Sequence, residues 1–287
     1  MKKILLAVAT LVLASCVTAP ARSPVAGSAP GAAPAAPKPV VPAVREMTYE
    51  EPLPISVKTQ YPNGDPSGSK TFQYNAKGQL VRQETFNANG LLTEVRTGSA
   101  KGAVWRITAT NAQNGEVLSF EDLTFGPKGE LLTQTFSDAK EIPQASNEYT
   151  YDALGRKSQW LAKTGGGGLQ ARTVYTYDNR GNNIKTEGFD AGGKLVNVFL
   201  ATFDDQSQIL TFSGFDQSNT LVELTTYTWK DKLKLKEEMT KPLLRTTEFT
   251  YGDKPAPTGI VSSVRGKVVE RQTLEYQWFT KTKTVTP

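Results

Sequence analysis

The side chains of this chain that could do chemistry are carboxylates and one cysteine, because none of its 287 residues is histidine. Without imidazole, Ser-His-Asp and Cys-His nucleophilic sites, imidazole metal sites and the commonest general base are excluded. Aspartates that recur at similar positions are candidates for calcium binding or for acid–base work on sugars. They are Asp152, Asp178, Asp190, Asp204 and Asp216.

Most of these acids also begin a recurrent turn signature, in which Asp or Asn is followed three residues later by glycine. The carboxylate or amide can bond the backbone two residues on, and glycine supplies a positive φ. We therefore interpret them as turn residues and predict no catalytic residue, metal ligand or cofactor. The repeat-turn residues are Asn75, Gly78, Asp152, Gly155, Asp178, Gly181, Asp190 and Gly193.

The only cysteine, Cys16, follows a short export signature. Lys2 and Lys3 precede an apolar stretch over residues 4–13, and two small residues come next. Such a segment predicts a secretory signal, since a membrane span needs about 20 apolar residues. An ordinary signal peptide with an incidental cysteine is the alternative to an anchor.

The stretch Leu13-Ala14-Ser15-Cys16 resembles the lipobox of bacterial lipoproteins. The resemblance implies cleavage between Ser15 and Cys16, a diacylglycerol on the cysteine sulfur and an acylated amine. It implies a lipid-anchored protein of the cell envelope. Val17 is not the aspartate that resembles an inner-membrane retention signal, so the outer membrane is implied if the organism is diderm.

Composition divides the chain into a signal peptide at 1–15, a tether at 16–54 that begins with the lipidated cysteine, and a repeat domain at 55–287. Nine of the 17 prolines lie in the tether, which predicts an extended, disordered segment with a reach on the order of 100 Å. The net charge is +5, too small an excess to indicate nucleic acid. The predicted partners are the membrane, through the acyl chains on Cys16, and an envelope protein or glycan.

The repeat domain has a period of 26 residues, visible as one aromatic slot occupied in turn by Phe125, Tyr151, Tyr177, Phe203 and Trp229. Aromatic residues two apart lie on one face of a strand, and turn signals every 11 to 14 residues indicate antiparallel hairpins. We predict an all-β fold: an elongated antiparallel meander of repeated hairpins that forms a twisted, rolled or partly open sheet.

We expect this sheet to be rolled or stacked so that its aromatic face is covered, with Gln83, Gln159 and the threonines facing water. Two alternatives stay open. One is a partly single-layered sheet, as in some spirochaete surface lipoproteins, and the other is a small closed barrel.

The copies Tyr149-Thr150-Tyr151-Asp152-Ala153-Leu154-Gly155-Arg156 and Tyr175-Thr176-Tyr177-Asp178, with Gly181, resemble the YD repeats of the RHS family. The resemblance covers most of residues 60–280 and implies strand-turn units that serve as a scaffold or binding surface. In giant members the repeats close into shells around toxic cargo. This chain is too short to enclose a polypeptide, and no toxin module follows its repeats.

Four lysines spaced two apart, Lys230, Lys232, Lys234 and Lys236, are predicted to share one face of a strand. They are a candidate binding surface for anionic lipid or glycan, or else a guard against edge-to-edge aggregation. The function that fits all these features is a non-enzymatic, lipid-anchored envelope protein that presents a repeat sheet as a structural or binding surface. The alternatives are a carrier for hydrophobic cargo and a carboxylate-based carbohydrate-active enzyme.

Overall fold

The computed structural model describes residues 45–285, with side chains described for 48–281. The predicted signal peptide, Ser15 and Cys16 lie outside this range. Within it, no helix has the length and apolar character that crossing a bilayer would require.

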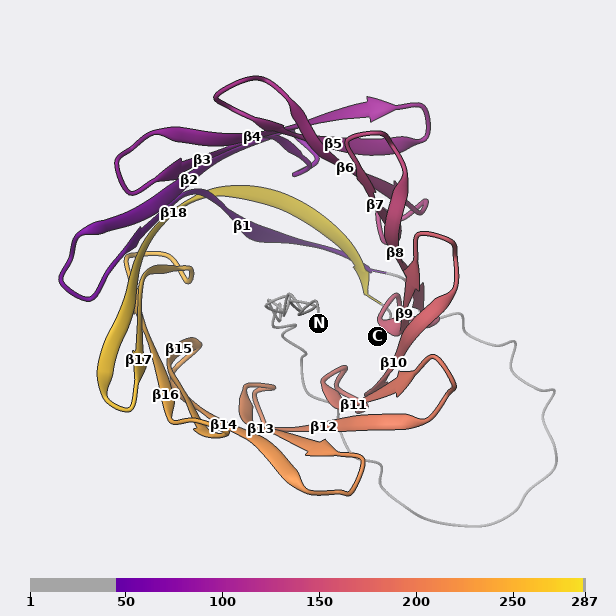
Figure 1. The fold of residues 1–287 in the computed structure, drawn as a ribbon. Helices are drawn as coiled ribbons and strands as arrows, with labels where there is room; N and C mark the ends of the chain where they lie inside the picture. Colours follow the sequence, from indigo (N-terminus) through magenta and orange to yellow (C-terminus); the bar gives the residue numbers. More distant parts are fainter. Residues whose placement is uncertain (1–44, 286–287) are drawn as a thin grey trace, which may run out of the picture.

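The described residues form 18 strands joined by short turns (Figure 1). The strands are β1 (Arg45–Gln60), β2 (Pro66–Tyr74), β3 (Leu80–Asn87), β4 (Leu92–Lys101), β5 (Val104–Asn111), β6 (Val117–Phe125), β7 (Leu131–Asp138), β8 (Pro143–Tyr151), β9 (Lys157–Thr164), β10 (Leu169–Tyr177), β11 (Asn183–Asp190), β12 (Leu195–Phe203), β13 (Ile209–Asp216), β14 (Leu221–Lys230), β15 (Leu233–Lys241), β16 (Arg245–Tyr251), β17 (Pro257–Val264) and β18 (Lys267–Val285).

Each strand pairs antiparallel with the next along the chain, and β1 also pairs with β18, so the sheet closes on itself. Figure 1 shows the resulting ring. The predicted all-β meander of repeated hairpins is confirmed. The sheet is fully closed rather than partly open, and with 18 strands it is larger than the small closed barrel considered as an alternative.

The β10–β11 hairpin shows how the repeat motif makes a turn. The Asp178 carboxylate accepts hydrogen bonds from the amides of Arg180 (3.0 Å) and Asn182 (2.7 Å). Gly181 has a φ of 88°, which its missing Cβ permits. The strand register shifts between Thr176 and Tyr177, directly before the turn. Such bulges, repeated at most hairpins, bend and twist the strands and so favour closure.

The pleat gives the closed sheet two chemically different faces. The aromatic face carries Tyr74, Tyr151, Tyr177, Trp229 and Tyr251, and the opposite side, the threonine face, carries the threonine-rich alternate positions. Along β14, Tyr227 and Trp229 are half-buried, whereas Thr226 and Thr228 are exposed. The side chains of the aromatic face therefore shield one another along the sheet.

Within residues 48–281 no second layer covers the aromatic face, contrary to expectation. Only nine described side chains are less than about 9% exposed, and none of the large ones is fully buried. An 18-stranded barrel is too wide for its own side chains to fill, so a single layer without a close-packed core is the physical result. Gln83 does not face water as predicted: it lies on the aromatic face, opposite Arg96, and is 9% exposed.

The closing strands are longer than the rest and form a two-stranded ribbon. β2 pairs with β1 only from Ser56 onward, and β17 pairs with β18 only as far as Thr273, whereas β1 and β18 pair with each other from Arg45 and Val285. In the view of Figure 1 the ribbon crosses the inside of the ring. The predicted domain boundary at 54/55 therefore falls inside β1, which starts ten residues earlier.

Candidate functional site: the aromatic face and its apolar pocket

The acids singled out from the sequence all lie in turns, each bonded to its own backbone. Asp152 accepts from the amides of Leu154 (2.9 Å) and Arg156 (2.8 Å), and glycines of these turns, such as Gly155, have positive φ. Burial alone raises the pKa of Asp152, but the amide and guanidinium of Arg156 outweigh it, and the net pKa is lowered. The same turn geometry holds at Asn75, Gly78, Asp178, Gly181, Asp190, Gly193, Asp204 and Asp216.

The up-and-down topology places these acids at opposite ends of the barrel. Asp152, Asp178 and Asp204 close hairpins at one rim, whereas Asp190 and Asp216 close hairpins at the other. In the part of the chain that is described, no three acidic, cysteine or histidine residues converge as metal ligands. The carboxylates do not gather into a cleft, and each is engaged in local backbone bonds. The arrangement suits turn formation, not acid–base catalysis.

The prediction that Lys230, Lys232, Lys234 and Lys236 share one strand face is wrong. β14 ends at Lys230, and β15 starts at Leu233, so Lys232 lies in the turn between them. The lysines therefore belong to a turn and two different strands. Spacing alone missed this hairpin because its short turn lacks both the leading Asp or Asn and the glycine of the repeat signature; Asp231 takes the positive φ instead.

A register shift between Thr228 and Trp229 then separates the two lysines of β15. Lys234 lies opposite Trp229 on the aromatic face, with its Nζ 4.7 Å from the centre of the Phe249 ring. Lys236 lies opposite Thr228 on the threonine face. The two ammonium groups also pair with acids on their own strand. No basic ribbon results.

The aromatic slot of the repeat ties each hairpin to its neighbour. Tyr177 Oη donates to the carbonyl oxygen of Lys157, 20 residues earlier, at 2.8 Å. We call this bond a clasp, because it joins the end of β10 to the start of β9 outside the regular strand ladder. Further clasps join Tyr74 to Pro54 (3.0 Å), Tyr151 to Leu131 (2.8 Å), Trp229 to Ile209 (2.7 Å) and Tyr251 to Lys234 (2.7 Å).

Cations cover several faces of these rings. Arg156 lies over the Tyr177 ring at 4.6 Å, and Lys157 lies over the Tyr149 ring at 4.3 Å. Lys254 covers the Trp278 ring at 4.6 Å. A sugar would have to displace such cations in order to stack on the same ring faces, although cation–π contacts are themselves favourable. At these rings the face that the cation covers is therefore not free for stacking.

A polar chain crosses the middle of the aromatic face from β4 to β9. Arg96 pairs with Glu121 at 2.6 Å, and Glu121 is 13% exposed. Gln134 donates to Glu121 at 2.7 Å and accepts from Asn147 at 3.0 Å. Trp160 Nε1 completes the chain by donating to Asn147 at 2.9 Å. Arg96 Nε is buried and has no hydrogen-bond partner among the described residues. The other contacts of the chain are made in sequence from strand to strand, so these polar groups hold five side chains in one register.

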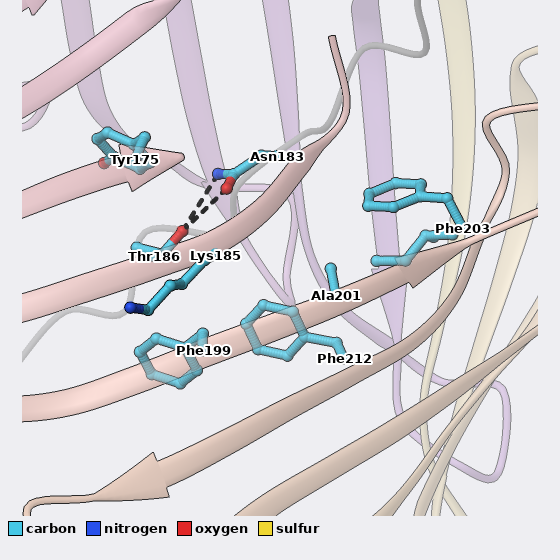
Figure 2. A pocket seen from close by; sticks show the side chains of 9 residues that line it. Tyr175, Asn183, Lys185, Thr186, Phe199, Ala201, Phe203 and Phe212 are labelled. Carbon is cyan, nitrogen blue, oxygen red and sulfur yellow. Dashed lines mark hydrogen bonds between the residues drawn. The ribbon is translucent and has the colours of Figure 1, made fainter. Parts of the chain in front are cut away.

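One copy of the repeat leaves a gap. Its slot residue is Phe203, which has no hydroxyl to make a clasp, and two residues earlier stands Ala201 in place of a large side chain. The gap is a pocket of about 160 Å³ between β10 and β13, shown in Figure 2. It is lined by Tyr175, Asn183, Lys185, Thr186, Phe199, Ala201, Phe203, Ile209 and Phe212.

The pocket walls are mainly aromatic. The rings of Phe199 and Phe212 stack at 5.2 Å with 15° between their planes. Burial raises the pKa of Tyr175 to about 12, so its phenol is neutral at physiological pH. Thr186 and Asn183 hydrogen-bond to each other at the pocket edge (3.1 Å; Figure 2). The chemistry on offer is apolar contact, with the nearby polar groups already engaged.

This pocket was missed at the sequence level, although the signal was present. In other copies the residue two before the slot is large: Phe72, Leu123, Tyr149, Tyr175, Tyr227 and Phe249. When the copies are aligned, alanine at position 201 therefore predicts an unfilled space, provided that nothing else covers the aromatic face. The pocket is smaller than the roughly 300–1,000 Å³ typical of small-molecule sites, so it is too small to enclose lipid-sized cargo.

Comparisons with known proteins give structural likeness at low similarity. No family model and no curated protein matches the chain. A porin-like protein from Bacteroides uniformis has a TM-score of 0.44 and 9% identity, over 78% of this chain and 98% of its own. A porin-like protein from Bacteroides vulgatus has a TM-score of 0.32 and 12% identity, over 79% and 99%. The TcdB2-TccC3-TEV structure has a TM-score of 0.27 and 11% identity; this chain spans 74% of its own length and 16% of that one.

Proposed function

We propose that this is a non-enzymatic, lipid-anchored protein of the bacterial envelope whose closed sheet binds another envelope protein. Acyl chains on Cys16 hold it at the membrane, the outer membrane in a diderm organism, and the proline-rich segment spaces the barrel from the bilayer. Two or three chains suffice for a durable anchor, since each buried methylene contributes about 0.8 kcal/mol. The observation that carries the binding role is the pocket at Ala201 on the aromatic face.

Attachment by acyl chains, and not by the barrel wall, is supported by ion pairs on both faces. The aromatic face holds Arg96–Glu121, and the threonine face holds Arg106–Asp122, whose side chains are 12% and 23% exposed. A lipid-facing barrel needs an apolar band about 25 Å tall, and an Arg or Lys at its midplane costs roughly 2–4 kcal/mol. Whichever face pointed outward would place such charges in lipid.

A protein partner is favoured over a glycan because cations already lie over ring faces such as those of Tyr149 and Tyr177. A sugar needs an open ring face together with free hydrogen-bonding groups. A protein side chain needs only an apolar, shaped recess, which the pocket at Ala201 provides.

Membrane fractionation and partner retention test the proposal. Replacing Cys16→Ala should move the chain from the membrane to the soluble fraction and abolish palmitate labelling; a variant that stays membrane-bound contradicts the anchor. Immobilised full chain should retain a protein from envelope extracts that the Ala201→Phe variant does not retain. Retention of glycan alone, or conductance in planar bilayers, would contradict the binding role.

A further inference from the structure

We propose that the pocket at Ala201 is a binding site for an uncharged apolar group the size of one phenyl ring. The inference deepens the proposed function by stating what chemistry the partner must offer. It also stands by itself, since binding at the pocket does not depend on how the chain is anchored.

The pocket lies where the repeating pattern of large side chains is interrupted by a small one. In the copy before the pocket, the pair of positions on the aromatic face holds Tyr175 and Tyr177, so both positions carry a ring. At the next copy this first position is Ala201, and Phe199, Phe203 and Phe212 surround the space that a ring would take. The walls are thus already shaped for an aromatic side chain that this chain does not supply.

The size of the space fits one ring. Its volume is about 160 Å³. An apolar cavity of about 150 Å³ lined by aliphatic and aromatic side chains stays dry and takes up benzene. Water in such a space has few polar partners, so its displacement by an apolar ring is favourable. A lipid chain or an oligosaccharide is too large to be enclosed there.

The polar groups at the pocket edge explain why the ligand should be uncharged. Asn183 and Thr186 bond to each other, and Lys185, whose ammonium pairs with Glu187 at 2.8 Å, lies opposite Leu200 on the threonine face. An anion or a polyol would have to break these bonds to gain partners. An aromatic ring needs none of them, and it meets the stacked pair Phe199 and Phe212 in offset or edge-on contact.

Fluorine NMR on the full chain carrying Cys16→Ala tests the site without acyl chains or detergent that would compete for it. Fluorobenzene represents a free apolar compound, and N-acetyl-4-fluorophenylalaninamide represents a side chain of a protein partner. We expect saturable binding of fluorobenzene, weakened at least tenfold by Ala201→Phe. The matched control is Leu200→Phe, which adds a ring at a position 40% exposed on the threonine face and should change affinity less than twofold.

Each outcome decides the matter. Binding of both probes, lost in Ala201→Phe, supports the site and assigns it to a protein side chain; binding of fluorobenzene alone supports the site and assigns it to a free apolar compound. No saturable binding of either probe, or equal binding by Ala201→Phe, overturns the proposal. If Ala201→Phe does not fold, Phe203→Ala replaces it: the enlarged pocket should bind 1-fluoronaphthalene at least fivefold more tightly than the unaltered chain does, and no gain overturns the location.

The two proposals fail separately. Probe binding that persists while no envelope protein is retained refutes the protein-binding function and leaves the site. Retention of a protein by a chain whose pocket takes no probe refutes the site and leaves the function.

Discussion

The clasps make a quantitative prediction, because the same bond recurs, four times with the same spacing, and the copy at Phe203 lacks the hydroxyl to make it. Removing the hydroxyl in Tyr177→Phe deletes a 2.8 Å bond to the Lys157 carbonyl while leaving the ring under Arg156. A hydrogen bond of this kind contributes about 1 kcal/mol net to stability. For a domain of this length that corresponds to a fall in Tm of roughly 2–4 °C.

The converse change adds a clasp. Phe203 occupies the slot that lacks a hydroxyl, and the carbonyl of Asn183 stands 20 residues before it, the spacing found in four of the clasps. Phe203→Tyr should therefore raise the free energy of unfolding by up to about 1 kcal/mol. Urea unfolding followed by tryptophan fluorescence measures both changes on one scale.

A matched control lies two residues from the first mutation. Tyr175 is on the same face and strand as Tyr177, but among the described residues its hydroxyl meets no hydrogen-bond acceptor, so Tyr175→Phe should leave stability at neutral pH within about 0.3 kcal/mol. If Tyr177→Phe and Tyr175→Phe have the same effect, the clasps contribute nothing beyond ring burial and the reasoning is refuted.

Three other changes test separate features. Gly98→Ala should destabilise the barrel by about 1–3 kcal/mol, because its Cβ would lie 1.9 Å from the Leu80 carbonyl oxygen. Gly252→Ala should be neutral by urea unfolding, because its Cβ would make only an ordinary contact, 3.8 Å from Thr258 Cγ2. Arg96→Met should cost about 2 kcal/mol by leaving the half-buried acid of the polar chain unpaired, and wild-type stability in this variant would contradict that role. Burial raises the pKa of Tyr175 to about 12 in the folded state, so the folded state holds the phenol proton more tightly than the unfolded chain does. The resulting contribution to the free energy of unfolding is complete below about pH 10 and is lost toward pH 12. A urea midpoint that does not change between these pH values would contradict the burial of the phenol.

Local chemistry could be predicted from the sequence because it depends on a few adjacent residues. Asp178 and Gly181 make the turn that their types imply, and the 26-residue period predicts hairpins of one kind repeated along the chain. Where the signature is absent the prediction fails: the turn after Lys230 has no glycine, and the lysine ribbon inferred across it does not exist.

The tertiary structure decided how the hairpins combine. Closure depends on the pairing of β1 with β18, whose residues are more than 200 positions apart and carry no repeat signature to announce it. The bends from bulges and strand twist add up over 18 strands. A small difference in curvature at each hairpin therefore decides whether the whole sheet is an open ribbon, a stack of layers or a closed ring. Strand alternation could be read from the chain, but whether a second layer covers the aromatic face is a property of the whole sheet. The vacancy at Ala201 becomes a pocket because no such layer among the described strands fills it.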